Sequence, residues 1–501
     1  MTRLGQANSA RQARSHRREF LADSLTPLAA YRRLCDLSPH RFLLESIASG
    51  SQVSRFSFLG AKPSKVCKVY EDRIEIEAKD ATEVLDGPPV PALRSLLSSI
   101  CAEPDSIPFS GGWVGNFGYD TIRLVERLPN RPAKDPYGLP IATLARFDDV
   151  IVFDHARQRV VAIANEIEGE VDRQAAEQRL EKLSELLTAE AVGGAVAIPA
   201  DARSVPDTLP PSLSGSQYQD AVRKAKEYIA AGDIFQVVPA RRWAIPSDIE
   251  PLALYRALRM VNPSPYMVLL ETPDVALISG SPEMVVRKTG DLLETRPIAG
   301  TRPRGKDAEE DRRLSEELLA DPKERAEHVM LVDLSRNDLG RVAQAGSVRV
   351  TEFMVLEYYS HVIHLVSSVQ ARIREDVTAL DALLACFPAG TLCGAPKIRA
   401  MEIIDELEPE ARGPYGGAIG YFSFTGDMDT CIAIRTMVVK DGEISISAGA
   451  GIVADSDPAT EQKETESKAA AMLQAVSLAG SLADIEGLPM GPSRAFEENG
   501  S

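Results

Sequence analysis

The chain has 501 residues, of which 44% are hydrophobic and 26% charged, a composition typical of a globular protein with a sizeable core. Its 56 Lys and Arg against 73 Asp and Glu give a formal net charge of −17, which repels nucleic acids and anionic membranes. No apolar run approaches the ~20 residues that a membrane-spanning helix needs. The six cysteines form no CxxC pair, which argues against a disulfide or zinc framework, so we expect a cytoplasmic protein that binds neither nucleic acid nor membrane.

The N-terminal segment is basic. Its first eighteen residues hold five arginines and no acid, but they lack the apolar core of a secretory signal. We expect residues 1–20 to be a disordered tail, with an organellar transit peptide as the alternative.

The elements that follow alternate between strands and helices without a fixed repeat. In chain order, the patterns predict strands within 66–76 and 150–164, a helix over 172–187, a helix over 217–231, strands at 267–270 and 275–279, a helix over 307–319, and strands at 417–423, 431–439 and 444–448. Because the order is not a strict βαβ alternation, we expect an α+β fold with large antiparallel sheets.

The stretch 187–216 is rich in Gly, Pro, Ala and Ser and has no amphipathic period, so it predicts a linker or surface loop. It divides the chain into regions at 1–20 (tail), 21–186 (N-terminal region), 187–216 (linker), 217–485 (C-terminal region) and 486–501 (flexible tail).

Two pairs of acids at a spacing of three are candidates for metal binding. Glu324 and Glu327 follow Asp321 at a helix start, and Glu461 and Glu464 repeat the spacing. Two such helices side by side would offer hard oxygen ligands to Mg²⁺. In so acidic a chain the same spacing also arises by chance on solvated helix faces, so the pattern alone leaves both interpretations open.

Glycines beside two strand ends could form anion cradles from backbone N–H groups. They lie in 297–301, with Gly300 and Thr301, and in 447–451, with Gly449, Ala450 and Gly451. The alternative is a tight strand-to-helix turn.

Two histidines and one arginine lie within apolar runs, where polar side chains need a partner. Strand alternation points His361 and His364 to opposite faces, so at most one of them would face a site. Arg435 lies within the apolar run 431–439, where its charge needs a partner, either a substrate carboxylate or an internal acid.

Ordered motifs over residues 40–475 together resemble the chorismate-utilising enzymes, most closely the anthranilate synthase component I family. The motifs are GDIFQ (232–236), GSPE (280–283), PIAGT (297–301), DPKERAEH (321–328), LVDLSRNDLG (331–340), PAGTLCGAPK (388–397), GPYGG (413–417) and the segment 447–468. The resemblance implies one catalytic fold of two large antiparallel sheets flanked by helices, with 217–485 as the chorismate-binding region and the N-terminal half packed against and partly into it.

The resemblance also implies roles for site residues. Glu283 would be the general acid for the departing C4 hydroxyl, which requires a raised pKa, and His364 and Thr391 would assist in the same pocket. The implied Mg²⁺ ligands are Glu327 and Glu464, with Glu324 and Glu461 beside them. The implied substrate contacts are Gly300, Thr301, Tyr415, Arg435, Gly449, Ala450, Gly451 and Lys468.

Two positions distinguish members of the family. Gln236 stands where the water-activating relatives carry a lysine base, so ammonia is the implied nucleophile. Ala299 stands where many aminodeoxychorismate synthases carry a lysine that attacks the ring. The implied reaction is addition of ammonia at C2 with loss of the C4 hydroxyl, then elimination of pyruvate to leave anthranilate, the first step of tryptophan synthesis.

The resemblance further implies regulation and a partner. A tryptophan site would use Glu45, Ser46, Arg55, Pro265, Tyr266, Met267 and Tyr421. Because no cysteine lies in a Gly-x-Cys-x-Gly context, ammonia from glutamine would require a separate amidotransferase subunit, in a heterotetramer of two large and two small subunits. The alternatives are an aminodeoxychorismate synthase component I and a tryptophan-binding regulatory homologue without catalysis. Cys393 departs from the serine that relatives usually carry.

Overall fold

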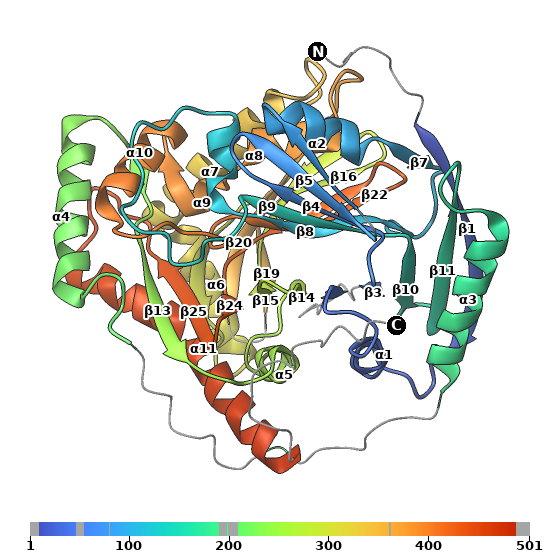
Figure 1. Cartoon of the computed structure of the whole chain (residues 1–501). Helices are drawn as coiled ribbons and strands as arrows, with labels where there is room; N and C mark the ends of the chain where they lie inside the picture. The colour runs from blue at the N-terminus through green and yellow to red at the C-terminus, as the bar shows by residue number, and fades with distance from the viewer. Residues whose placement is uncertain are drawn as a thin grey trace.

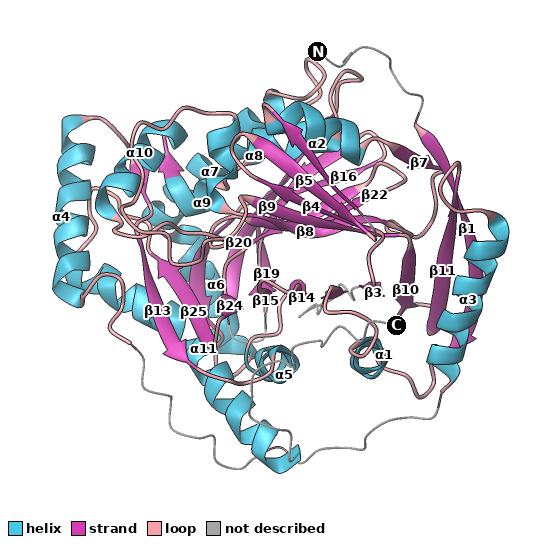
Figure 2. Cartoon of the chain, viewed as in Figure 1, coloured by secondary structure: helices cyan, strands magenta, loops and turns pink. Residues whose placement is uncertain are grey.

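The computed structural model describes residues 10–46, 55–79, 81–189, 198, 209–359 and 362–486. Two large sheets lie in the middle and helices surround them (Figure 2). This confirms the expected α+β fold with a two-sheet antiparallel core, since every strand pair described in the two large sheets is antiparallel except β1 with β7. No helix in the described part of the chain is long and apolar enough to cross a membrane.

The first sheet has eleven strands. In spatial order they are β13 (Ala240–Pro246), β25 (Glu443–Gly449), β24 (Thr436–Lys440), β15 (Ala276–Ser281), β14 (Tyr266–Glu271), β2 (Arg41–Glu45), β3 (Phe56–Ala61), β10 (Asp149–Asp154), β11 (Arg159–Ile167), β1 (Arg11–Leu21) and β7 (Ile100–Ala102).

The second sheet has twelve strands. In spatial order they are β18 (Ile298–Pro303), β20 (Val362–Arg372), β17 (Leu292–Thr295), β16 (Met284–Thr289), β23 (Met428–Ile432), β22 (Ala418–Ser423), β8 (Gly112–Phe117), β9 (Ala142–Phe147), β4 (Lys65–Val69), β5 (Arg73–Ala78) and β6 (Ala81–Asp86), with β19 (Arg349–Tyr358) also paired to β20. A separate short ladder joins β12 (Gln236–Val237) to β21 (Gly394–Ala395).

Helices cover the outer faces. They are α1 (Pro27–Leu34), α2 (Pro89–Leu97), the 3₁₀ helix η1 (Tyr119–Leu124), α3 (Arg173–Thr188), α4 (Gly215–Ala231), α5 (Pro251–Val261), α6 (Ala308–Ala320), α7 (Pro322–Gly340), α8 (Ala379–Cys386), α9 (Gly390–Cys393), α10 (Lys397–Leu407) and α11 (Pro458–Glu486). In Figure 1, α11 and α4 flank β13 and β25, and α3 flanks β1 and β11.

Alternating side chains divide the core into three layers. Phe42 of the first sheet and Phe147 of the second meet between the sheets, edge to face at 4.6 Å between ring centroids. Each such pair adds about 1 kcal/mol to the burial of the rings. The outer face of the first sheet packs against helices that include α5 and α11, and the outer face of the second packs against helices that include α8 and α10.

Both large sheets contain strands from before and after the expected linker. β2 and β3 lie inside the first sheet, where Glu45 opposes Met267 of β14. The expected linker 187–216 is wrong at its ends, because α3 continues to Thr188 and a capping box of Ser214 and Gln217 starts α4. Residues 190–197 and 199–208 lie outside the described residues, as does 487–501 of the expected C-terminal tail.

The expected disordered tail is wrong for residues 11–20, which form β1. This strand pairs with β11 along nine residues. Its basic side chains meet acids that lie far along the chain: Arg18 contacts Glu181 at 2.8 Å and His16 contacts Glu166 at 3.1 Å. Because these partners are remote in sequence, the local excess of arginine gave no sign of the pairing. Residues 1–9 lie outside the described part.

Candidate active site

Glu283 lies between β15 and β16, in the interior. Its carboxylate accepts a hydrogen bond from the Thr391 hydroxyl, at 3.2 and 3.3 Å to the two oxygens. Burial raises the pKa of Glu283 to about 8, against the opposing effects of Thr391 and the Lys468 ammonium. The raised pKa expected at this position is confirmed, so the carboxyl is protonated at neutral pH and has a proton to donate.

His364 lies on β20 opposite Thr301 of β18. Its Nδ1 is 3.0 Å from the Gly300 carbonyl oxygen and 3.1 Å from the Thr301 hydroxyl. A ring nitrogen that faces a carbonyl carries the proton, which leaves Nε2 as the basic nitrogen. Burial lowers the pKa of His364, so the ring is neutral at pH 7. His361 lies outside the described residues.

Gly300 forms a bulge in β18 that brings this strand close to α7. Its φ is +66°, and a Cβ on it would lie 3.3 Å from Oε2 of Glu324. A glycine relieves both the left-handed backbone and the close approach. The second glycine segment begins within the end of β25, and the carbonyl of Gly449, the last residue of that strand, accepts from Lys468 Nζ at 2.9 Å.

The four candidate metal ligands come from the first two turns of the helices α7 and α11. Asp321 caps α7 by accepting from the backbone of Lys323 and Glu324. Burial, together with the charges of Glu324 and Glu464, raises the pKa of Glu327, and burial followed by the Glu464 charge raises that of Glu461. The charge of Glu464 on α11 acts on Glu327 of α7, so these two acids lie near each other.

These carboxylates are partly neutralised by cations. Arg302 contacts Glu324 at 3.0 Å, and Lys468 contacts Glu464 at 2.8 Å. Within the described ranges no three His, Cys, Asp or Glu side chains converge closely enough to form a ready metal cage. The donors are nevertheless hard oxygens whose mutual repulsion a divalent cation would relieve.

Gln236 connects the metal side to the glycine segment. Its Nε2 donates to Oε1 of Glu327 at 3.3 Å, and a Cβ on Gly451 would lie 2.6 Å from the same Nε2. The side-chain amide oxygen of Gln236, Oε1, is buried without a hydrogen-bond partner in the described structure. Such a group is available to a ligand N–H.

Arg435 lies in a break between two strands where we predicted one continuous strand. The single strand expected over 431–439 is interrupted, because β23 ends at Ile432 and β24 begins at Thr436. Arg435 lies in the break with φ +48°, a strained value for a side-chain-bearing residue. Its guanidinium donates to Asn262 at 3.2 Å, and no carboxylate among the described residues pairs with it. A largely buried cation in this state is suited to bind an anion.

Tyr415 completes the group of substrate contacts that sequence reasoning proposed. It is buried, and its hydroxyl lies 3.2 Å from the position that a Cβ on Gly449 would occupy. Burial raises the pKa of Tyr415 to about 12, so the hydroxyl stays protonated and can donate.

Cys393 is buried in α9, where its thiol donates to the Ala389 carbonyl at 3.3 Å.

The proposed tryptophan contacts lie around β2 and β14. Glu45 is buried; it accepts from the Tyr255 hydroxyl at 2.7 Å and lies 3.4 Å from Arg259. Ser46 follows it at the end of β2. Met267 opposes Glu45 and packs on the helix-covered face of the sheet.

Tyr266 packs on the other face of the same strand, between the sheets, so it does not enclose the same space as Met267. Its hydroxyl donates to Asp429 at 3.0 Å. Tyr421 belongs to the same inner layer, whereas Arg55 pairs with Asp154 at 3.0 Å and Pro265 precedes β14.

Sequence reasoning missed two polar residues that hold the site. Asn262, which accepts from Arg435, lies three residues before Pro265, the start of the 265–267 stretch proposed for the tryptophan site. Arg412 stands immediately before the GPYGG motif and lies against the ring of Tyr415. For Arg412, the only local signal in the sequence is an arginine directly before a turn motif, at a position that the fold buries.

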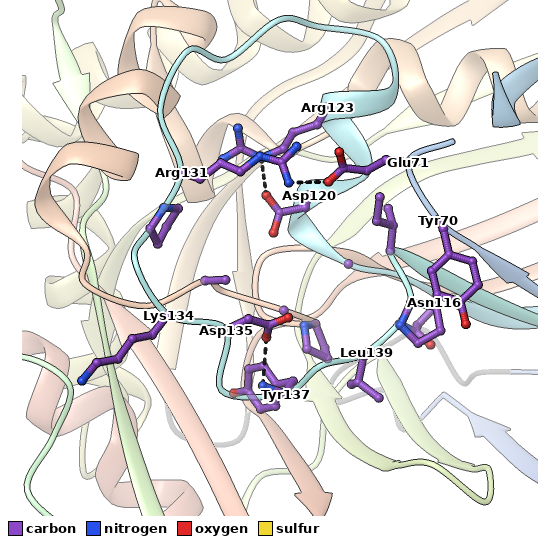
Figure 3. A pocket seen from close by; sticks show the side chains of 17 residues that line it. Tyr70, Glu71, Asn116, Asp120, Arg123, Arg131, Lys134, Asp135, Tyr137 and Leu139 are labelled. Carbon is purple, nitrogen blue, oxygen red and sulfur yellow. Dashed lines mark hydrogen bonds and ion pairs between the residues drawn. The ribbon is translucent and has the colours of Figure 1, made fainter. Parts of the chain in front are cut away.

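Another cavity, with a volume of about 280 Å³, lies away from these residues (Figure 3). Its charged side chains are mostly paired with one another: Arg123 contacts Asp120 at 2.6 Å, and Arg131 pairs with Glu71. None of the predicted site residues lines it, although Gly413 and Pro414 connect it to the Tyr415 loop. A smaller cavity of about 40 Å³ adjoins Glu283 and Thr391.

Comparisons with known proteins agree with this arrangement. A family model described as chorismate binding enzyme matches residues 39–474. Anthranilate synthase component 1 of Thermus thermophilus is 47% identical, over 93% of this chain and 98% of the relative, and that of Pseudomonas putida is 46% identical, over 92% and 94%.

Solved structures give the same result. A crystal structure of anthranilate synthase component I from Streptococcus pneumoniae superposes with a TM-score of 0.76 at 37% identity, covering 91% of this chain and 99% of that one. The menaquinone-specific isochorismate synthase of Escherichia coli, at 18% identity and a TM-score of 0.71 over 93% and 95% of the two chains, shares the fold.

Proposed function

This chain belongs to the chorismate-binding enzymes and, within them, to the anthranilate synthase component 1 family, and on that premise we propose that it converts chorismate and ammonia to anthranilate, pyruvate and water. The observation that carries the proposal is the protonated, buried carboxyl of Glu283 held by Thr391. The reaction would supply the first step of tryptophan synthesis.

In the first step the ammonia lone pair forms a bond to C2 of the ring, both ring double bonds shift (C1=C2 to C1=C6 and C5=C6 to C4=C5), and the C4–oxygen bond breaks. The nitrogen then loses one proton to give the amine. Glu283 gives its proton to the departing hydroxyl, which leaves as water. A carboxyl with a pKa of about 8 is matched to this role at neutral pH.

In the second step the intermediate loses the C2 proton, and the bond between ring C3 and the enolpyruvyl oxygen breaks. Pyruvate leaves and the ring becomes aromatic. Neutral His364, with Nδ1 turned to the Gly300 carbonyl and Nε2 free, is our candidate to receive the C2 proton.

The choice of ammonia over water or an enzyme amine rests on two side chains. Gln236 has no basic group with which to activate water, and its amide is engaged by Glu327. Ala299 has no amine with which to attack the ring. Neutral ammonia needs no deprotonation before attack, so neither group is required.

Substrate capture follows from the local cations. We propose that Arg435 and Tyr415 bind one chorismate carboxylate together with the backbone of Gly449, Ala450 and Gly451, with Lys468 at the boundary to the acidic helices. Arg435 has no carboxylate partner within the described structure, so a bidentate contact to substrate would satisfy it.

The four acids of α7 and α11 fit a divalent cation by chemistry, as hard oxygen donors with raised pKa values at Glu327 and Glu461. We propose Glu327 and Glu464 as its direct ligands, with Glu324 and Glu461 beside them. When bound, Mg²⁺ would neutralise the ring carboxylate of chorismate. Without the cation, neighbouring side chains of the protein contact these carboxylate oxygens: Gln236 donates to Glu327, Arg302 contacts Glu324 and Lys468 contacts Glu464.

Ammonia from glutamine would come from a separate amidotransferase subunit, as the designation of the relatives as component 1 suggests. We propose a heterotetramer of two large and two small subunits. We also propose feedback inhibition by tryptophan at Glu45 and Ser46, with the inner-layer residues Tyr266 and Tyr421 responding from the other face of the sheet.

The test is anthranilate fluorescence with chorismate, Mg²⁺ and an ammonium salt at mildly alkaline pH, with and without EDTA and tryptophan. Anthranilate that disappears with EDTA supports the enzyme and the metal. Consumption of chorismate without anthranilate would move the chain to aminodeoxychorismate synthesis, and tryptophan binding without any consumption would indicate a regulatory homologue.

A further inference from the structure

A buried ion pair between Arg412 and Glu408 lies directly behind the candidate active site. Arg412 Nε donates to Glu408 Oε2 at 2.9 Å and Nη2 donates to Oε1 at 2.5 Å, and each side chain is less than a tenth exposed. Desolvation offsets most of the attraction in such pairs, so stability alone is a poor reason for one. The remaining contacts of the pair indicate another role.

The guanidinium holds two of the segments that carry site residues. Nη1 donates to the Leu392 carbonyl at 2.7 Å, and Nη2 donates to the Val238 carbonyl at 2.6 Å. Leu392 follows Thr391, which binds Glu283, and Val238 lies two residues after Gln236. One planar side chain therefore fixes the helix of the general-acid partner and the strand of Gln236 relative to each other.

Glu408 extends the connection to the glycine segment. Its Oε1 accepts from the backbone N–H of Ala240 at 2.8 Å. Ala240 opposes Gly449 in the ladder of β13 and β25. The position of Gly449 in the proposed carboxylate site is thus tied to the same carboxylate that orients Arg412.

The segment that contains Tyr415 is the third one that Arg412 contacts directly. The Arg412 guanidinium lies 5.6 Å from the centre of the Tyr415 ring and 4.6 Å from that of Tyr119, and the Arg412 carbonyl accepts from the Tyr415 backbone N–H at 3.1 Å. Cation–π contacts of this kind fix a ring in a dry environment.

We propose that Arg412, oriented by Glu408, is a positioning residue that sets the geometry of Thr391, Gln236 and Tyr415 around the substrate. This inference rests on the proposed function. Four oriented contacts in one plane require a guanidinium, since a lysine ammonium presents three donors from a single point.

The experiment compares Arg412→Lys and Glu408→Gln with Arg146→Lys. Arg146 is a matched control, because it is 2% exposed and pairs with buried Asp148 at 2.9 Å, while its other partners, Glu170 and Ser64, are not among the proposed catalytic residues. For each variant we would measure the melting temperature, kcat and KM for chorismate from pH 6 to 10, and the Kd for chorismate by calorimetry.

We expect all three variants to melt lower, and only Arg412→Lys and Glu408→Gln to lose kcat/KM, by about tenfold or more. Their activity should also persist to higher pH, because a looser Thr391 no longer lowers the pKa of Glu283, whereas Lys468, its charged neighbour, is unchanged. If both variants melt lower like Arg146→Lys but keep the wild-type kcat/KM and pH profile, the pair is structural only.

Failure of the proposed function is distinguishable. If the wild type binds chorismate but makes no anthranilate, the function is wrong, and the Kd values of the variants still decide the inference. An unchanged Kd in Arg412→Lys and Glu408→Gln overturns it, and a higher Kd in these two variants but not in Arg146→Lys supports it. If Arg412→Lys does not fold, Glu408→Gln, which keeps the shape of the side chain, decides by the same measurements. A wild type that does not bind chorismate overturns both.

Discussion

The side-chain amide of Gln236 donates to Oε1 of Glu327 at 3.3 Å, which joins the position that distinguishes family members to a proposed metal ligand. Gln236→Lys would place an ammonium within ion-pair reach of that carboxylate and compete with Mg²⁺. We expect the Mg²⁺ concentration for half-maximal activity to rise about tenfold. Titration of anthranilate formation with Mg²⁺ measures this, and Gln158→Lys, on an exposed turn, should leave it unchanged. If wild type, Gln236→Lys and Gln158→Lys need the same Mg²⁺ concentration, Glu327 is not a ligand of the metal.

Replacing Glu283 with Gln removes the proposed acid. We expect Glu283→Gln to lower kcat by at least about a hundredfold while chorismate still binds. The wild-type rate should fall above pH 8, as the carboxyl with a pKa of about 8 loses its proton. Initial rates across pH and calorimetric binding measure both effects. A variant with near wild-type kcat would assign the proton to another group.

The same substitution should change stability in a defined direction. The folded pKa of Glu283 is about 8 against an ordinary 4.5, so the folded state binds the proton more tightly and stability falls as pH rises between these values. Glu283→Gln cannot ionise, so we expect it to be more stable than wild type at pH 8, by roughly 4 kcal/mol. The difference should vanish near pH 4.5. Urea unfolding at both pH values measures it.

Gly451 leaves room for Gln236. A Cβ at this position would lie 2.6 Å from Gln236 Nε2, so Gly451→Ala must displace that amide. We expect KM for chorismate to rise about tenfold with a small change in melting temperature. Gly340→Ala is the control, because a Cβ there meets nothing within 4 Å. Unchanged kinetics in Gly451→Ala would mean that the amide is free to move without consequence.

Tryptophan inhibition is tested at the end of β2. Glu45→Gln and Ser46→Phe should retain activity within about twofold and require at least about tenfold more tryptophan for half-inhibition, since a charged amino group loses its carboxylate partner. Glu271→Gln serves as a control, because it alters another buried acid of the same sheet that binds Tyr31 and Arg41. Normal inhibition in both test variants would contradict the proposed sensor.

Much of the fold could be predicted from local patterns. The helix over 172–187 and the strand at 444–448 were predicted to within a few residues, because side-chain periodicity and caps are local signals. The break at Arg435 was not predicted, because the run 431–439 is apolar throughout apart from Arg435 and Thr436 and gives no turn signal between β23 and β24. The pairing of β1 was missed for a similar reason, as its partners are distant in sequence.

The site could be predicted less completely. Motifs identified Glu283, Glu327 and Gln236 individually. The contacts of Gln236 with Glu327 and of Glu283 with Thr391 join segments that no local pattern connects. Arg412 shows the limit most clearly, because its role depends on two backbone carbonyls whose residue types are irrelevant.

The pairing of β2 with β14 also has a consequence for synthesis on the ribosome. When the first 200 residues have emerged, β2 still lacks its partner at 266–271, and β13 later waits for β25 near the other end of the chain. Each nascent intermediate therefore presents an open strand edge. Folding of this chain should complete only after β25 has been synthesised, and it should depend on protection of those edges against pairing with neighbouring chains.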